Sequence, residues 1–192
     1  MAKTIRDTAE ETHLVPAEIK TARLRLRPLE AADTEELHRL WIDPDIRRYL
    51  WDDESVPIKR VIAIIEESSA QFQETGLGIW GVFLGSDDRL IGFCGYWPFR
   101  EPPELQLLYG IAPELWGKGL ATEAARAMID HGIERGLKRI AASADAPNLA
   151  SIRVMEKASM VHEKTVNHGA GDTVYYVVLR KGMEHEAGIE RG

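Results

Sequence analysis

Eight consecutive residues constrain the fold of this chain more than any others: Trp116-Gly117-Lys118-Gly119-Leu120-Ala121-Thr122-Glu123. They follow an apolar, strand-like run (105–112) that ends at Pro113. After them, apolar side chains recur on one helical face at Leu120, Ala124, Met128 and Ile133. A glycine-containing turn from strand to helix presents successive backbone N–H groups at the positive end of the helix, and such a turn binds phosphates. The pattern therefore predicts a phosphate-binding turn.

Two common phosphate fingerprints are excluded by the residues at this turn. A P-loop needs Ser or Thr after Gly-Lys, but Gly119 follows here, and Ala112 stands where the first glycine belongs. A dinucleotide-binding turn needs a third glycine where Thr122 stands. A tight connection without a ligand also uses glycine for its backbone geometry, so that alternative stays open.

The turn instead resembles the acyl-CoA motif of the GNAT acetyltransferases, Gln/Arg-x-x-Gly-x-Gly/Ala, with Trp116, Gly119 and Ala121 on its defined positions. The sequence of this turn, Trp-Gly-Lys-Gly-x-Ala-Thr-Glu-Ala, is similar to that of the branch that includes the ribosomal-protein N-terminal acetyltransferases. A second segment (148–157) is similar to the Asn-x-x-Ser-x-Arg-x-x-Glu-Lys helix of that branch. The resemblance extends from about 22 to 180 and implies an acetyl-CoA-dependent acyltransferase.

Composition sets the class of protein. With 192 residues, 44% hydrophobic and 29% charged, we expect one globular domain at 21–181, a loose arm at 1–20 and a charged tail at 182–192. No apolar run reaches the ~20 residues of a membrane span, and the net charge of −7 argues against nucleic acid or an anionic membrane as partner. The single cysteine, Cys94, excludes an internal disulfide and suits the cytoplasm. We expect a monomer or a homodimer.

Hydrophobic periodicity predicts alternating strands and helices. Strands are expected at 23–27, 78–84, 89–96, 105–112, 139–144, 161–166 and 173–180. Helices are expected at 31–41, 57–74, from Leu120 onward, and at 148–158. This order predicts an α+β, three-layer fold with a mixed, mostly antiparallel central sheet of about seven strands and helices on both faces. The GNAT fold has the same order.

The resemblance implies which residues bind acetyl-CoA, the expected co-substrate. The strand before the turn would separate from its neighbour and hold the pantetheine arm through Tyr109, Gly110, Ile111 and Ala112. The N–H groups of Gly117, Lys118, Gly119, Leu120, Ala121 and Thr122 would hold the pyrophosphate. Asn148 would contact the arm or only cap its helix, and Arg153 and Lys157 would reach the 3′-phosphate or adenine, or remain solvated.

The catalytic positions depart from the commonest family pattern. Gln106 stands where a glutamate base is frequent, so Glu104, on the same strand face, is predicted as a base acting through water, or else is only a solvated carboxylate. Met155 replaces the usual tyrosine acid. Ser151 is predicted to protonate or hydrogen-bond the departing sulfur, or else only to satisfy a first-turn N–H group.

The acceptor is predicted to be an amine. An α-amino group is roughly a tenth neutral at pH 7, whereas a lysine-type amine is almost wholly protonated, so a weak base favours a peptide N-terminus. A small cationic amine, attracted by an acidic segment that carries Trp41 and Trp51, is the alternative, as is a non-catalytic acyl-CoA-binding protein. No metal is expected, because His131, His162 and His168 lack zinc-site spacing and read as surface or capping residues.

Overall fold

A computed structural model describes residues 18–85, 87–99, 104–169 and 171–180 of the chain. The strands are β1 (Ile19–Lys20), β2 (Leu24–Pro28), β3 (Ile79–Leu84), β4 (Leu90–Phe99), β5 (Glu104–Ile111), β6 (Arg139–Asp145), β7 (Val161–Asn167) and β8 (Asp172–Leu179). The helices are η1 (Ala31–Asp33), α1 (Thr34–Trp41), α2 (Pro44–Leu50), α3 (Ile58–Thr75), η2 (Pro113–Leu115), α4 (Leu120–Glu134) and α5 (Leu149–Lys157). Most of the predicted arm and the whole tail lie outside the described residues.

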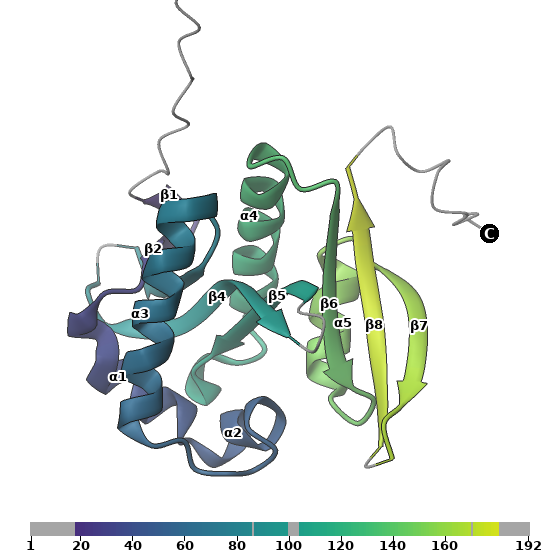
Figure 1. Cartoon of the computed structure of the whole chain (residues 1–192), viewed down its shortest axis with the longest axis horizontal. Helices are drawn as coiled ribbons and strands as arrows, with labels where there is room; N and C mark the ends of the chain where they lie inside the picture. The colour runs from purple at the N-terminus through teal and green to yellow at the C-terminus, as the bar shows by residue number, and fades with distance from the viewer. Residues whose placement is uncertain (1–17, 86, 100–103, 170, 181–192) are drawn as a thin grey trace, which may run out of the picture.

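The strands form one eight-stranded sheet in the order β1-β2-β3-β4-β5-β6-β8-β7. Every neighbouring pair is antiparallel except β5 and β6, which are parallel (Figure 1). The predicted mixed, mostly antiparallel sheet is thus confirmed. The eighth strand is β1, whose two residues pair with Leu26 and Arg25 of β2.

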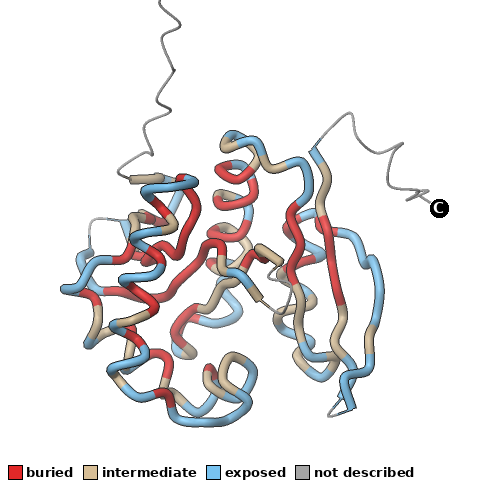
Figure 2. The backbone as a smooth tube through the Cα atoms, in the orientation of Figure 1, coloured by how far each residue is buried: buried red, intermediate tan, exposed pale blue. Residues whose placement is uncertain are grey.

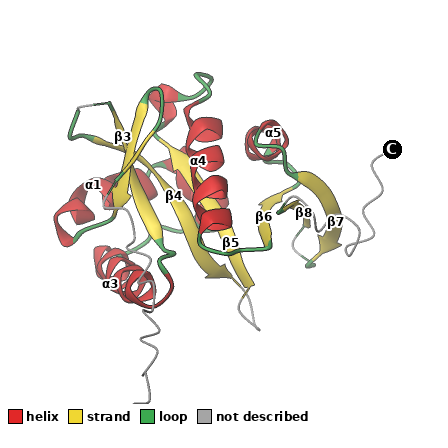
Figure 3. Cartoon of the chain, turned by 90° about the horizontal axis from the view of Figure 1, so that it is seen from above, coloured by secondary structure: helices red, strands yellow, loops and turns green. Residues whose placement is uncertain are grey.

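Helices cover both faces of the sheet, as the periodicity predicts (Figure 3). On one face α4 and α5 bury Leu120, Met128 and Met155 against the sheet. On the other face α1 and α3 bury Leu37, Val61 and related side chains in a second cluster. Figure 2 shows that the buried stretches of the chain lie along the central strands and the helices packed on them, whereas the outer turns are exposed. Burial of each such side chain contributes about 1.5–3 kcal/mol.

Three local features differ from the prediction. Helix α2 was missed, because its seven residues are too few to show a period, although Asp43 caps it by accepting from Asp45 N at 2.9 Å and Pro44 begins it. The periodicity of α3 places Val61, Ile62, Ile65 and Phe72 on its apolar face, but Ile62 is 42% exposed and Ile64 is buried in addition to the other three. The prediction that His131 lies at the surface is wrong. It is buried, its Nε2 lies 3.0 Å from the Gly76 carbonyl, and its ring stands edge-on to Trp80.

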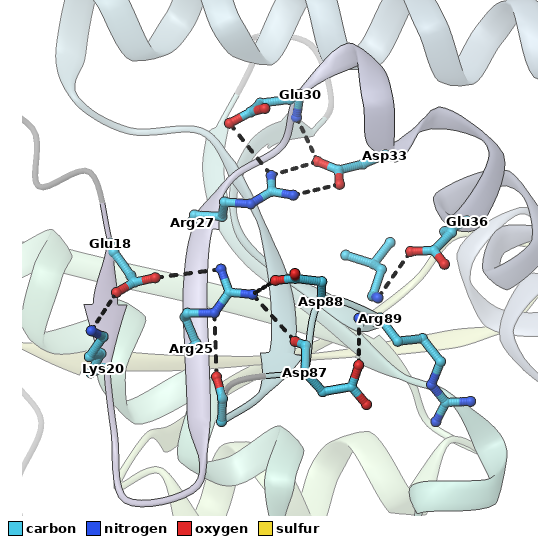
Figure 4. A network of polar contacts seen from close by, with 12 residues as sticks. Glu18, Lys20, Arg25, Arg27, Glu30, Asp33, Glu36, Asp87, Asp88 and Arg89 are labelled. Carbon is cyan, nitrogen blue, oxygen red and sulfur yellow. Dashed lines mark hydrogen bonds and ion pairs between the residues drawn. The ribbon is translucent and has the colours of Figure 1, made fainter.

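The first strands are tied together by arginines that alternate with leucines. Leu24 and Leu26 point into the core, so Arg25 and Arg27 point to the opposite face. Arg25 pairs with Glu18 and with Asp88 of the β3–β4 turn, at 3.5 and 2.7 Å (Figure 4). This network fixes the edge of the sheet that lies beside the start of α4.

Candidate active site

The predicted phosphate-binding turn is present and open. Gly117 and Gly119 both have left-handed backbones, with φ of 75° and 77°, as this reversal between η2 and α4 requires. The first helical bond runs from Glu123 N to Gly119 O at 3.1 Å. Among the described residues, no protein group accepts from the N–H groups of residues 117–122. Six consecutive backbone donors are therefore free to bind an anion at the positive end of α4.

The turn is held from its flanks. The indole N–H of Trp116 donates to the Ile111 carbonyl at 2.6 Å, and Trp116 is 48% exposed. Arg23 donates to the Lys118 carbonyl at 2.8 Å and forms an ion pair with Glu123 at 2.7 Å. These contacts involve carbonyls and side chains and leave the backbone donors free. The turn is thus pre-organised, which lowers the entropic cost of binding a ligand.

A cavity of about 470 Å³ adjoins the turn. It is lined by Gly119 and Thr122 of the turn and by Arg23, Arg126 and Asp130, among others. It runs along α4 toward β1. It reaches the 117–122 turn through Gly119 and Thr122, and neither Tyr109 nor Ser151 lines it.

Strands β5 and β6 separate next to this turn. One residue pair, Gln106 with Ala141, joins them in register, whereas eight pairs join β4 to β5. Beyond Gln106 the β5 edge that faces β6 therefore lacks a partner strand. The predicted separation is confirmed. Two groups assigned to the pantetheine arm are already occupied, because Ile111 O accepts from Trp116 and Ala112 N donates to Ile91 O at 2.8 Å.

Helix α5 faces this open edge through Ser151. The phenol oxygen of Tyr109 lies 2.8 Å from Ser151 Oγ and 2.9 Å from the Ser151 carbonyl oxygen. Asn148 is the N-cap of α5, because its side-chain oxygen accepts from Ser151 N at 3.1 Å. Burial raises the pKa of the Tyr109 phenol, although its bond to Ser151 acts in the opposite direction. Tyr109 is therefore neutral at physiological pH.

On the opposite face of the sheet the two candidate base positions lie together, as the strand period predicts. Gln106 is buried, and its Oε1 accepts from Ser143 Oγ at 2.8 Å. The Glu104 carboxylate accepts a hydrogen bond from the Arg139 guanidinium at 2.7 Å and one from the Gln106 amide N–H at 3.5 Å. Sequence reasoning missed Arg139 and Ser143. The period-two alternation of β6 was the signal, since it places these two side chains on one face.

At the end of α5 the chain reverses through hydrogen bonds from Ser159 N to Glu156 O and from Met160 N to Met155 O, both at 3.0 Å. Ser159 takes the left-handed conformation expected of a glycine at this position, with φ of 66°. Met160, the next residue, is buried in the core and anchors this end of the helix. Arg153 and Lys157 are exposed, and the Lys157 carbonyl accepts from Arg126 of α4.

Several carboxylates of the acidic segment at 30–54 already form hydrogen bonds or ion pairs within the protein. Asp33 is buried against Arg27, Glu36 accepts from Leu90 N, and Asp53 pairs with Arg47 at 3.1 Å. Trp41 is buried and packs in the core against Trp51 and Phe93, so its ring is not available to a cationic amine at the surface.

Neither a reactive thiol nor a metal centre emerges from the described part of the chain. Cys94 is buried, and burial raises the pKa of its thiol. Within residues 18–180, apart from the undescribed gaps, no three histidine, cysteine or carboxylate side chains are grouped to hold a metal. In the same residues, no helix is both long and apolar enough to cross a membrane.

Comparisons with known proteins agree with this geometry. Residues 23–161 match the family model "Acetyltransferase (GNAT) domain". The protein YkkB of Bacillus subtilis is 35% identical over 153 residues, which cover 76% of this chain and 86% of that protein. A GNAT-family acetyltransferase from Bacillus anthracis superposes with a TM-score of 0.70 at 27% identity, covering 84% of this chain and 98% of the other.

A further structural neighbour shows the fold alone. An acetyltransferase from Salmonella typhimurium, described as modifying the N-terminal serine of ribosomal protein L7/L12, has a TM-score of 0.71 at 15% identity, over 87% of this chain and 99% of its own. The family match and the YkkB relationship cover most of the chain. The chain therefore belongs to the GNAT acetyltransferase family and is an acyltransferase.

Proposed function

We propose that this enzyme transfers an acetyl group from acetyl-CoA to the α-amino group of a peptide or protein N-terminus. The diphosphate of CoA binds the free N–H groups of residues 117–122, and the Thr122 hydroxyl adds a donor. The pantetheine arm follows the open edge of β5 past Tyr109 and Gly110. Arg153 and Lys157 contact the 3′-phosphate end. The enzyme works in the cytoplasm, where its single cysteine suits the reducing environment.

One observation carries the choice of acceptor: the carboxylate on the catalytic strand is held in an ion pair, which makes it a weak base. The position of the frequent glutamate base is Gln106, which is buried and bonded to Ser143. The carboxylate of β5, Glu104, is held by Arg139, and a proton taken up by Glu104 would break this ion pair. Such a site favours an amine that is already partly neutral. At pH 7 that describes an α-amino group (roughly a tenth neutral) far better than a lysine amine (about one in 2,500).

A panel of amines tests this choice. The first substrate is a short peptide with a free α-amine and no lysine; the second is the same peptide with its N-terminus blocked and one lysine added; the third is spermidine. Thiol release and product mass are measured at pH 7. We expect the free N-terminus to react at least about tenfold faster. Faster acetylation of spermidine would favour the small-cation alternative, and tight CoA binding with no reaction on any amine would favour a non-catalytic binding protein.

Glu104 is proposed as the base that removes the ammonium proton through a water molecule. Glu104→Gln is expected to lower kcat by about 10²-fold with CoA affinity unchanged. Glu163→Gln is the matched control, because Glu163 holds the same guanidinium of Arg139 at 2.7 Å from the side of β7. Equal losses in the two variants would assign Glu104 to the ion pair alone.

A further inference from the structure

Tyr109 and Ser151 meet across the gap between β5 and α5. The phenol oxygen lies within hydrogen-bond distance of two oxygens of one residue, the Ser151 hydroxyl at 2.8 Å and the Ser151 carbonyl at 2.9 Å. A phenol has one proton to donate, so it binds one of the two at a time. When it donates to Oγ, the serine O–H is free to donate elsewhere. When it donates to the carbonyl, the serine can donate back to the phenol.

The chemistry of acetyl transfer requires a donor at the sulfur. The amine nitrogen forms a bond to the acetyl carbon, the carbon–sulfur bond breaks, and its electron pair stays on sulfur. The ammonium formed on nitrogen gives its proton through a water molecule to Glu104, and the sulfur leaves as a thiolate that afterwards takes a proton from solvent water. Negative charge therefore develops on sulfur, where a fixed O–H donor stabilises the transition state. An unrestrained serine hydroxyl rotates among three staggered positions and presents this donor only part of the time.

We propose that Tyr109 is a positioning residue that donates to Ser151 Oγ and thereby directs the Ser151 O–H toward the sulfur of the departing CoA. This inference rests on the proposed role of Ser151 in acetyl transfer. The Ser151 N–H is already bound by Asn148, so helix capping makes no demand on the serine hydroxyl. Met155, one turn farther along α5, is buried and has no hydroxyl. A hydroxyl that accepts one hydrogen bond is also a stronger donor in the next.

Tyr109 acts as a donor and not as the proton source. Burial raises the pKa of its phenol above the ordinary ~10, whereas a thiol has a pKa near ~8.5. Proton transfer from this phenol to a thiolate would therefore run uphill. The pair stabilises the thiolate by hydrogen bonding, so the thiol of bound CoA becomes more acidic than the thiol of free CoA.

The test is a titration of the CoA thiol on the enzyme, which needs no acceptor. CoA is bound to the wild-type protein, the thiolate is followed by its ultraviolet absorbance, and the desulfo-CoA complex serves as the blank. We expect the thiolate-to-thiol ratio of bound CoA to be about tenfold above that of free CoA at a given pH. In Tyr109→Phe, titrated at saturating CoA, this gain should be lost. Ser151→Ala and the double variant should give the same loss, because both residues act through one donor.

Tyr96→Phe is the matched control. Tyr96 is a second tyrosine that donates to a backbone carbonyl, that of Met128 at 2.7 Å, but it is buried in the core under α4. The Tyr96→Phe variant should be less stable than the wild-type protein, but the thiol of its bound CoA should titrate as in the wild-type complex. An unchanged titration in Tyr109→Phe with CoA bound would overturn the positioning role and leave the proposed function standing. Failure of desulfo-CoA to bind the wild-type protein would instead overturn the proposed CoA site, and this inference with it.

Discussion

Arg27 and Asp33 form a two-point ion pair, with both N–O distances at 2.8 Å. Asp33 is buried, and the same carboxylate accepts from Glu30 N at 2.8 Å (Figure 4). The guanidinium of Arg27 also stacks on the Phe83 ring, 4.6 Å from its centroid. The pair fixes the direction in which the chain leaves β2 and begins η1 and α1. It thereby sets the position of the helical layer opposite α4.

Neutralising this carboxylate should be costly. Asp33→Asn removes the charge that compensates Arg27, and we expect a loss of about 3 kcal/mol in the free energy of unfolding. Asp88→Asn is the control, since Asp88 pairs with Arg25 at a similar distance but its side chain is 96% exposed. That change should cost less than about 1 kcal/mol. Equal costs in urea denaturation would contradict the structural role of Arg27 and Asp33.

A glycine at position 159 should stabilise the protein. Ser159 has φ of 66°, a conformation that costs a residue with a Cβ about 1 kcal/mol relative to glycine. We expect Ser159→Gly to raise the free energy of unfolding by about 0.5–1 kcal/mol. Ser69→Gly, at an exposed position inside α3, should lower it by a similar amount or less. Thermal denaturation of the two variants checks the opposite signs.

His131 makes stability depend on pH. Burial is the largest cause that lowers the pKa of its imidazole in the folded state, below the ordinary value of 6.5. Below pH 6.5 the unfolded chain therefore binds more protons than the folded chain, and stability falls as the pH drops. Above pH 6.5 this contribution is complete and constant. Denaturation between pH 5 and 8 should show this slope in the wild-type protein and in His162→Gln, whose histidine is exposed, but a smaller slope in His131→Gln.

The conformation of Gly119 should matter for CoA more than for folding. Gly119→Ala places a Cβ on a left-handed backbone (φ 77°) and shifts the neighbouring N–H groups. We expect the Kd for CoA to rise about tenfold. Gly136→Ala imposes the same backbone strain (φ 92°) just beyond the other end of α4, with no atom near the new Cβ. Both variants should lose about 1 kcal/mol of stability, so a loss of affinity in both would assign the effect to strain alone.

Regular elements could be predicted because their side chains repeat. The alternation of Leu24 and Leu26 with arginines identified β2, and the glycines of 116–122 identified the turn before α4. The short α2 and the two-residue β1 carry too few residues for a period. The left-handed conformation of Ser159 was not predicted, because glycine is the residue expected in the helix-ending turn that the Met160 N to Met155 O hydrogen bond closes.

Individual residues of the candidate site could be predicted from the sequence, but the contacts between them could not. Strand period placed Glu104 and Gln106 on one face, and helix capping identified Asn148. The partners of these groups come from β6 and from across the gap: Arg139, Ser143 and the Tyr109–Ser151 contact. Such contacts depend on strand order, which local pattern does not contain. His131 was misjudged for the same reason, since its neighbours Gly76 and Trp80 are distant in sequence.

The binding of the CoA diphosphate by the N–H groups of residues 117–122 can be measured directly by amide NMR. Uniformly labelled protein is titrated with CoA, with 3′-phospho-ADP, which contains the diphosphate, and with pantetheine, which contains no phosphate. We predict that the amide resonances of Gly117, Gly119 and Thr122 shift with the first two ligands and stay in place with the third. If CoA binds while these three resonances remain unchanged, the diphosphate lies elsewhere and the account of the site is wrong.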